Sequence, residues 1–98
     1  MIVIWTPEAK ASFNSNIDFL LTEWGEQVAS DFIDRVDEVI QTITKNPRLY
    51  PVINKKDSIH RCVVVKQITL YYRLTSAEHI YLIAFWNNYR DPEFLSFL

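Results

Sequence analysis

Basic side chains gather in the second half of this 98-residue chain, and together with nearby aromatic rings they could bind negatively charged groups. Tyr71, Tyr72 and Tyr89 are close to them in the sequence. Between positions 45 and 73, Asp57 is the only acidic residue against seven basic ones. These are Lys45, Arg48, Lys55, Lys56, Arg61, Lys66 and Arg73. Cationic groups beside aromatic rings favour phosphate contacts with base stacking, and they suit the docking of an acidic protein equally well.

Other site chemistries lack the residues that they need. His60, His79 and Cys62 do not have metal-ligand spacing, so we expect no metal. With Gly25 as the only glycine, a Gly-rich phosphate loop is impossible, and we expect no nucleotide or other cofactor. Cys62 lies among valines in a predicted strand, where a buried and inert thiol is expected.

Composition limits the class of protein further. A chain that is 49% hydrophobic and 22% charged can bury a core, which excludes intrinsic disorder. A single cysteine allows no internal disulfide, so a reducing compartment, the cytoplasm, is expected. Charged residues interrupt every stretch long enough to cross a bilayer, so we expect no membrane span and no signal peptide.

Charge is divided unevenly along the chain, although the net charge is only −2. Residues 1–44 carry two basic and eight acidic side chains, whereas residues 45–98 carry eight basic and four acidic ones. This asymmetry predicts a basic working face opposite an acidic one. The alternative is two solvated surfaces that merely differ in composition.

Two amphipathic helices are predicted in the first half, after a short strand over residues 2–5. Thr6 is a suitable N-cap and Pro7 suits the first helical position, so a helix should begin at Pro7. Gly25 suits the cap at its C-terminus, and Asn46-Pro47 should end the second helix. The expected apolar stripes are Phe13, Ile17, Leu20, Leu21 and Trp24 in the first helix, and Ala29, Phe32, Val36, Val39, Ile40 and Ile43 in the second.

Strand-forming residues dominate the second half of the chain. Residues 45–57 are predicted to form a surface loop. The segments Ile59–Val65, Ile68–Leu74 and Ile80–Trp86 are joined by short turns and predict an antiparallel meander. Asp91-Pro92 predicts a short C-terminal helix.

The order β-α-α-β-β-β-α predicts one α+β domain over residues 1–98. We expect an antiparallel sheet, made of the N-terminal strand and the three-strand meander and covered on one face by the helical hairpin of residues 7–45. Val63, Leu70 and Leu82 should face the helices. The other face would be open, and function is expected there.

The turn at Lys66-Gln67 decides how the basic residues are distributed over the sheet. A turn of even length places Arg61 with Tyr72 and Arg73 with His60, whereas a turn of odd length places Arg61 and Arg73 on one face. The sequence leaves both arrangements open.

The element order and several local motifs resemble the RelE/ParE superfamily of type II toxin–antitoxin toxins over nearly the whole chain. No single motif is unique to that superfamily, and their order and spacing together carry the resemblance. The motifs are Trp5-Thr6-Pro7-Glu8-Ala9, Lys45-Asn46-Pro47, Ile59-His60-Arg61-Cys62-Val63-Val64-Val65, Leu70-Tyr71-Tyr72-Arg73-Leu74 and Phe85-Trp86-Asn87-Asn88-Tyr89-Arg90-Asp91-Pro92.

The resemblance implies a small cytoplasmic bacterial toxin that inhibits growth and forms a hetero-oligomer with a cognate antitoxin, usually encoded beside it. Two activities occur in this superfamily. RelE-like members cut messenger RNA in the ribosomal A site without a metal. ParE-like members are regarded as inhibitors of DNA gyrase and carry no recognised catalytic set. A different class, an interaction module without toxicity, also remains open.

Three positions depart from the RelE-like nuclease pattern. Thr69 stands where those nucleases place an arginine at the start of the second meander strand, and Asn88 where another follows the last strand. Phe94 replaces the tyrosine of the terminal helix. Arg90-Asp91-Pro92 is closer to the ParE-like pattern of an arginine followed by Asp-Pro. The sequence therefore favours the ParE-like branch and a binding protein over an enzyme.

The candidate site residues all lie in the basic half. For a nuclease, the available groups are His60, Arg61, Arg73, Tyr89 and Arg90, of which His60 and Tyr89 could transfer a proton. For binding the antitoxin or the target, the expected anchors are Arg61, Arg73, Trp86, Tyr89 and Arg90, because arginine and aromatic residues dominate interface energies. Alternatively, Arg90 pairs with Asp91 or Glu93 and Trp86 belongs to the core.

Overall fold

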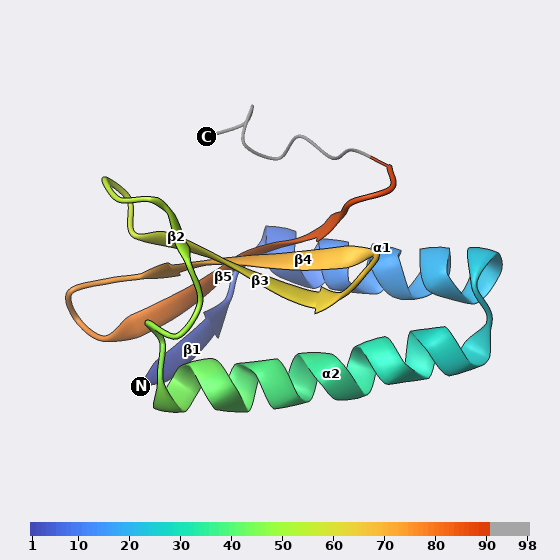
Figure 1. Ribbon diagram of the computed structural model, residues 1–98, viewed down its shortest axis with the longest axis horizontal. Coiled ribbons are helices and arrows are strands. Elements are labelled where there is room, and N and C mark those ends of the chain that lie inside the picture. The colour runs from blue at the N-terminus through green and yellow to red at the C-terminus, as the bar shows by residue number, and fades with distance from the viewer. Residues whose placement is uncertain (91–98) are drawn as a thin grey trace.

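Two helices lie against one side of a five-stranded sheet in the computed structural model, which describes residues 1–90 (Figure 1). The helix predicted from Asp91-Pro92 lies outside these residues. In chain order the elements are β1 (Ile2–Trp5), α1 (Pro7–Glu23), α2 (Glu26–Lys45), β2 (Val52–Asn54), β3 (Ile59–Val65), β4 (Ile68–Leu74) and β5 (His79–Asn87). The predicted α+β class, with a helical hairpin covering a sheet, is confirmed.

Helix α1 begins and ends where its capping residues predict. The hydroxyl of Thr6 accepts a hydrogen bond from the backbone N–H of Ala9 at 3.1 Å and donates one to the carbonyl of Leu82 at 2.7 Å. The cap therefore also fixes the start of α1 to β5. Gly25 has φ +96°, a value that disfavours residues with a Cβ, and it separates α1 from α2.

The sheet has the strand order β1-β5-β4-β3-β2. It is mixed, and the expectation of an antiparallel sheet throughout is wrong for β1, which runs parallel to β5. Short turns join the successive strands β2, β3, β4 and β5, and these turns impose antiparallel pairing. Strand β1 lies beside β5 but is separated from it by nearly the whole chain, so no short turn fixes its direction. Within the predicted loop 45–57, residues Val52–Asn54 form the edge strand β2. A segment of three residues next to Pro51 is too short for its sequence to predict a strand.

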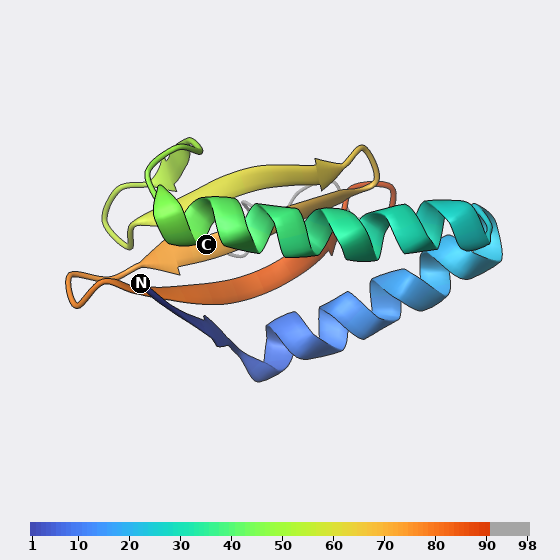
Figure 2. The same ribbon diagram turned by 90° about the horizontal axis from the view of Figure 1, so that it is seen from below.

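The main core lies between the helical hairpin and one face of the sheet; Figure 2 shows α2 running across that face. Its largest fully buried side chains include Leu20, Phe32, Tyr72, Leu82 and Phe85. The helical stripes therefore cover the sheet as the sequence predicts, with exceptions at the hairpin tip and on β3.

Three residues assigned to the core are exposed. Val63 is 57% exposed because its neighbours Cys62 and Val64 face the helices, so the alternation of β3 turns Val63 to the other side. Trp24 is 38% exposed because α1 ends at Glu23 and Trp24 is only its cap residue. Leu21, 45% exposed, lies on the outer side of α1.

Candidate functional site

The sheet surface that faces away from the helices brings together two of the predicted arginines. Arg61 on β3 lies directly opposite Tyr71 on β4, and Arg73 lies opposite Ile59. Arg61 and Arg73 are thus diagonal neighbours, which places their Cα atoms roughly 7–8 Å apart. Both side chains are exposed.

This arrangement depends on a β-bulge in β3. Val65 pairs with Ile68 across a two-residue turn, but Val63 pairs with Thr69, so Val64 is an extra residue on its strand. Without the bulge, the even-length turn would place the two arginines on opposite faces. The bulge shifts the register by one residue and brings them together, which settles the question that the sequence leaves open.

We call this surface the open face. Strand β5 extends it, because Tyr81 pairs with Arg73 and Trp86 pairs with Thr69. The second apolar cluster lies on this face and contains Tyr71, packed with Ile83 and other residues. The open-face residues on the three strands are Ile59, Arg61, Val63, Thr69, Tyr71, Arg73, Tyr81, Ile83, Ala84 and Trp86.

The charge on the open face is positive. Strands β3, β4 and β5 contain no Asp or Glu, and within residues 1–90 the ion pair present joins Arg35 to Glu38 on α2. Burial raises the pKa of the Tyr71 phenol, with the Arg61 guanidinium acting in the opposite direction. Tyr71 therefore stays protonated at neutral pH and is itself buried, so the face presents the two exposed arginines to a partner.

His60 does not belong to this surface. It is 3% exposed, its ring stacks on Tyr72 with centroids 5.0 Å apart, and its Nδ1 lies 2.9 Å from the carbonyl of Tyr50. Its β3 neighbour Arg61 points to the opposite side of the sheet. His60 is therefore packed away from the arginines that it would have to assist as a proton acceptor.

Tyr89 and Arg90 also leave the open face. The chain turns after β5, where the Asn87 side-chain oxygen accepts hydrogen bonds from the N–H groups of Tyr89 at 2.9 Å and Arg90 at 3.0 Å. Tyr89 then contacts Trp24 with ring centroids 5.7 Å apart, and the Arg90 guanidinium lies 5.0 Å from the centroid of the Phe19 ring.

The predicted binding set is thus divided into two places. Arg61, Arg73 and Trp86 share the open face, whereas Tyr89 and Arg90 lie beyond the end of β5, against α1. The structure therefore does not bring these five residues together, because the turn after β5 is fixed by side-chain hydrogen bonds that a sequence pattern does not reveal.

Three residues near Tyr89 and Arg90 were missed by the sequence interpretation. Phe19 was not assigned to a site, Trp24 was assigned to the core, and Lys66 was counted only as part of the basic stretch. The Lys66 ammonium lies 5.0 Å from the centroid of the Trp24 ring. A tryptophan next to a helix-ending glycine was the available signal, since a cap position leaves a side chain at the surface.

Two of the three positions that depart from the nuclease pattern meet in space, and the third, Phe94, lies outside the described residues. The Thr69 hydroxyl lies 3.1 Å from Oδ1 and 3.0 Å from Nδ2 of Asn88. The Asn88 backbone N–H donates to the carbonyl of Gln67 at 2.8 Å. At this point, where two arginines would give a concentrated positive charge, the chain has two neutral side chains bonded to each other.

Neither a metal centre nor a membrane helix is present in the described part of the chain. Within residues 1–90, no group of three or more His, Cys, Asp and Glu side chains is close enough to hold a metal ion. None of the helices there is long and apolar enough to cross a membrane. Cys62 is buried, and burial raises the pKa of its thiol, as an inert core cysteine requires.

Comparison with known proteins identifies the family. The profile of the "ParE toxin of type II toxin-antitoxin system, parDE" matches residues 3–92. The chain therefore belongs to the ParE family of type II toxin–antitoxin toxins. A search of curated protein sequences gave no match.

Solved structures share the fold. The chain is similar to one from the chromosomal ParDE TA system of P. aeruginosa, with a TM-score of 0.71 and 12% identity over 89% of this chain and 95% of that one. It is also similar to the YoeB/ParE toxin from Agrobacterium tumefaciens, with a TM-score of 0.62 and 12% identity over 89% and 98% of the two chains. A third match comes from the heterotetrameric YoeB-YefM toxin-antitoxin complex of Staphylococcus aureus, with a TM-score of 0.58 and 11% identity over 87% and 93%.

Proposed function

We propose that this chain is a growth-inhibiting toxin of the cytoplasm that acts by binding a cellular protein, DNA gyrase being the target that the family resemblance implies. Membership of the ParE family supports the toxin assignment. The observation that carries the choice of binding over cleavage is the Thr69–Asn88 pair, which leaves two neutral side chains where nuclease relatives have arginines.

The chemistry of RNA cleavage supports the same choice. Attack by a 2′-OH on its neighbouring phosphate needs a group that takes the proton and cations that stabilise the additional phosphate charge. His60 is buried and stacks on Tyr72, and Arg90 and Tyr89 lie beyond the end of β5 against α1, apart from Arg61 and Arg73. The open face therefore has two cations without a proton acceptor beside them.

One observation favours ribosome-dependent cleavage of messenger RNA as a second candidate. The exposed Arg61 and Arg73 share one surface with the half-buried rings of Tyr81 and Trp86, and cations beside aromatic rings suit phosphate contacts with base stacking. Two experiments separate the candidates: mapping of transcript ends shortly after induction, and a supercoiling assay with purified gyrase. Loss of supercoiling without new transcript ends supports gyrase binding. Prompt cleavage of translated messages with normal supercoiling would overturn it.

Toxicity itself is tested by induced expression with and without the adjacent gene. We expect growth to stop when the chain is expressed alone and to continue when the adjacent gene is co-expressed. Normal growth in the absence of that gene would instead indicate an interaction module without toxicity.

We also propose that a cognate antitoxin neutralises the chain by covering the open face. Antitoxin complexes among the structurally similar proteins support this partner. Arg73→Ala should weaken antitoxin binding by about 1–3 kcal/mol, the range for losing a hydrogen bond to a charged group. Arg48→Ala, on the exposed segment after α2, should change it little. Titration calorimetry measures both, and equal affinities for the two variants would remove the open face as the antitoxin site.

A further inference from the structure

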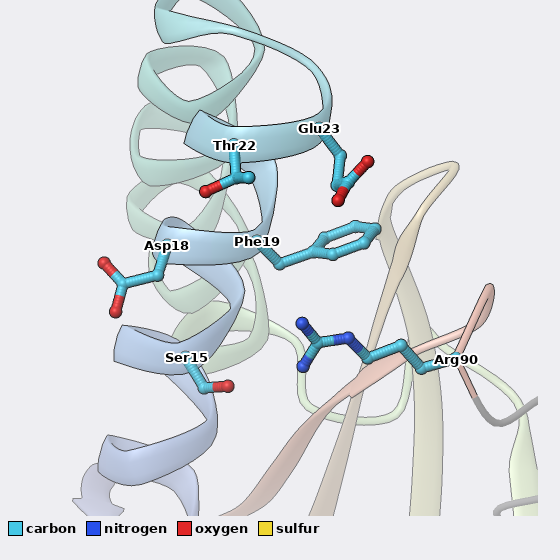
Figure 3. A pocket seen from close by; sticks show the side chains of 6 residues that line it. All are labelled: Ser15, Asp18, Phe19, Thr22, Glu23 and Arg90. Carbon is cyan, nitrogen blue, oxygen red and sulfur yellow. The ribbon is translucent and has the colours of Figure 1, made fainter.

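A pocket beside α1 is lined by Arg90, the predicted site arginine that does not lie on the open face. Its volume is about 280 Å³, and it lies between the C-terminal half of α1 and the chain that follows β5 (Figure 3). It is lined by Ser15, Asp18, Phe19, Thr22, Glu23 and Arg90. Figure 3 shows the Arg90 side chain reaching across toward α1, with Ser15 and Phe19 on either side of its guanidinium group.

Arg90 is positioned before any partner arrives. The Asn87 side-chain oxygen holds the backbone N–H of Arg90 at 3.0 Å, which fixes the point from which the side chain leaves. Its guanidinium then lies over the Phe19 ring at 5.0 Å, and Phe19 itself packs against the main core. An aromatic platform of this kind orients the planar guanidinium and lowers the entropy lost on binding.

Within residues 1–90 the Arg90 guanidinium has no carboxylate partner. None of its nitrogens forms an ion pair there, although Asp18 and Glu23 line the same pocket. Its hydrogen bond to Asn87 uses the backbone N–H rather than the side chain. An arginine provides five N–H donors in a fork that matches a carboxylate with two parallel hydrogen bonds.

We infer that this pocket receives one Asp or Glu side chain of the antitoxin, as a contact separate from the open face. The inference rests on the proposed function, which supplies the antitoxin as the partner. A carboxylate would lie on the Arg90 fork, with Ser15 lining the same pocket (Figure 3).

The pocket's own acids argue against a nucleic acid as the occupant. Asp18 and Glu23 line the pocket, and residues 1–44 as a whole carry eight acidic and two basic side chains. A nucleic-acid strand carries one negative charge per 3.4 Å and would meet this repulsion along its length. A single carboxylate meets the repulsion only once, and its hydrogen bonds with the Arg90 fork must outweigh it.

The experiment is titration calorimetry of the purified chain with the polypeptide encoded by the adjacent gene. Arg90→Ala should weaken binding about ten- to a hundredfold, the equivalent of losing a charged hydrogen-bonding partner. Arg90→Lys, which keeps the charge and loses the planar fork, should fall between Arg90→Ala and the unmodified chain. Phe19→Leu should weaken binding about two- to fivefold through loss of the platform. Arg48→Ala is the matched control and should bind normally.

A double-mutant cycle then identifies the carboxylate. Each Asp and Glu of the antitoxin is changed to Asn or Gln and tested against the unmodified chain and Arg90→Ala. The inference predicts one antitoxin residue whose replacement weakens the unmodified chain but not Arg90→Ala. Normal binding by Arg90→Ala, or an equal loss with every antitoxin variant, would overturn the pocket assignment. If the unmodified chain itself fails to bind the antitoxin, the proposed function is what fails.

Discussion

Replacing Tyr72 by phenylalanine tests how the end of the helical hairpin is tied to the sheet. Tyr72 lies in the middle of β4 with no exposed surface, and its hydroxyl donates a hydrogen bond of 2.7 Å to the carbonyl of Pro47, just beyond α2. Its ring stacks on His60 at an interplanar angle of 8°. Phenylalanine keeps the ring and its packing, so the substitution isolates the buried hydrogen bond.

The expected loss follows from that single contact. Removing the hydroxyl leaves the buried Pro47 carbonyl without this donor, which costs about 1–2 kcal/mol of the free energy of unfolding. In a domain of this size, each kcal/mol lowers Tm by about 4–8 °C, so a fall of about 5–15 °C is expected. Urea unfolding at pH 7 should show a lower midpoint with an unchanged slope.

Tyr89→Phe is the control, because Tyr89 is 54% exposed and its loss of a hydroxyl should change stability by less than about 0.5 kcal/mol. If Tyr72→Phe unfolds within about 0.3 kcal/mol of the unmodified chain, water must satisfy the Pro47 carbonyl in the folded state. The assignment of this bond as the tie between hairpin and sheet would then be refuted.

Three further outcomes can be measured on the same purified chain. Gly25→Ala should lower the free energy of unfolding by about 1–2 kcal/mol in urea titrations, because φ is +96° there although no atom lies within 4 Å of the added Cβ. Thr6→Ala should lower it by about 1–2 kcal/mol, since both the cap and the bond to the Leu82 carbonyl are lost, whereas Thr6→Ser should retain most of it. Burial raises the pKa of Tyr72 far above its usual value, so its contribution to the free energy of unfolding is complete below pH of about 10 and falls as pH rises further. Between pH 8 and 11, the free energy of unfolding should therefore decline less for Tyr72→Phe than for the unmodified chain.

The sequence predicts the bounds of the helices and strands better than it predicts how the strands pair. Pro7 begins α1, and the bounds of β3 and β4 match the predicted segments, because capping and strand propensity act locally. The pairing of β1 with β5 joins residues far apart in the chain, so no local pattern indicates whether it is parallel. β2 was missed because its pairing with β3 provides its stability, and its own three residues provide little.

The candidate site was predictable in its residue types but not in its grouping. Charge counting singled out Arg61 and Arg73, and alternation along a strand allowed two arrangements of them. The extra residue Val64 chose between these, and a bulge has no signature among consecutive valines. Arg90 lies apart from them because its side chain packs on Phe19, and a contact between residues 71 positions apart leaves no local sequence pattern.

The positions of the two basic sites limit the shape of a partner that engages both. The open face lies on the side of the sheet away from the helices, whereas Arg90 lies beyond the end of β5 and its side chain packs on Phe19 of α1. An extended polypeptide that crosses the open face and continues past the end of β5 can contact both sites. Such a segment orders on binding, and it recovers part of that entropy because the first contact raises the effective concentration of the second. The separation of the arginines therefore suits an extended partner, and removing either site should reduce affinity by more than the contacts of that site alone contribute.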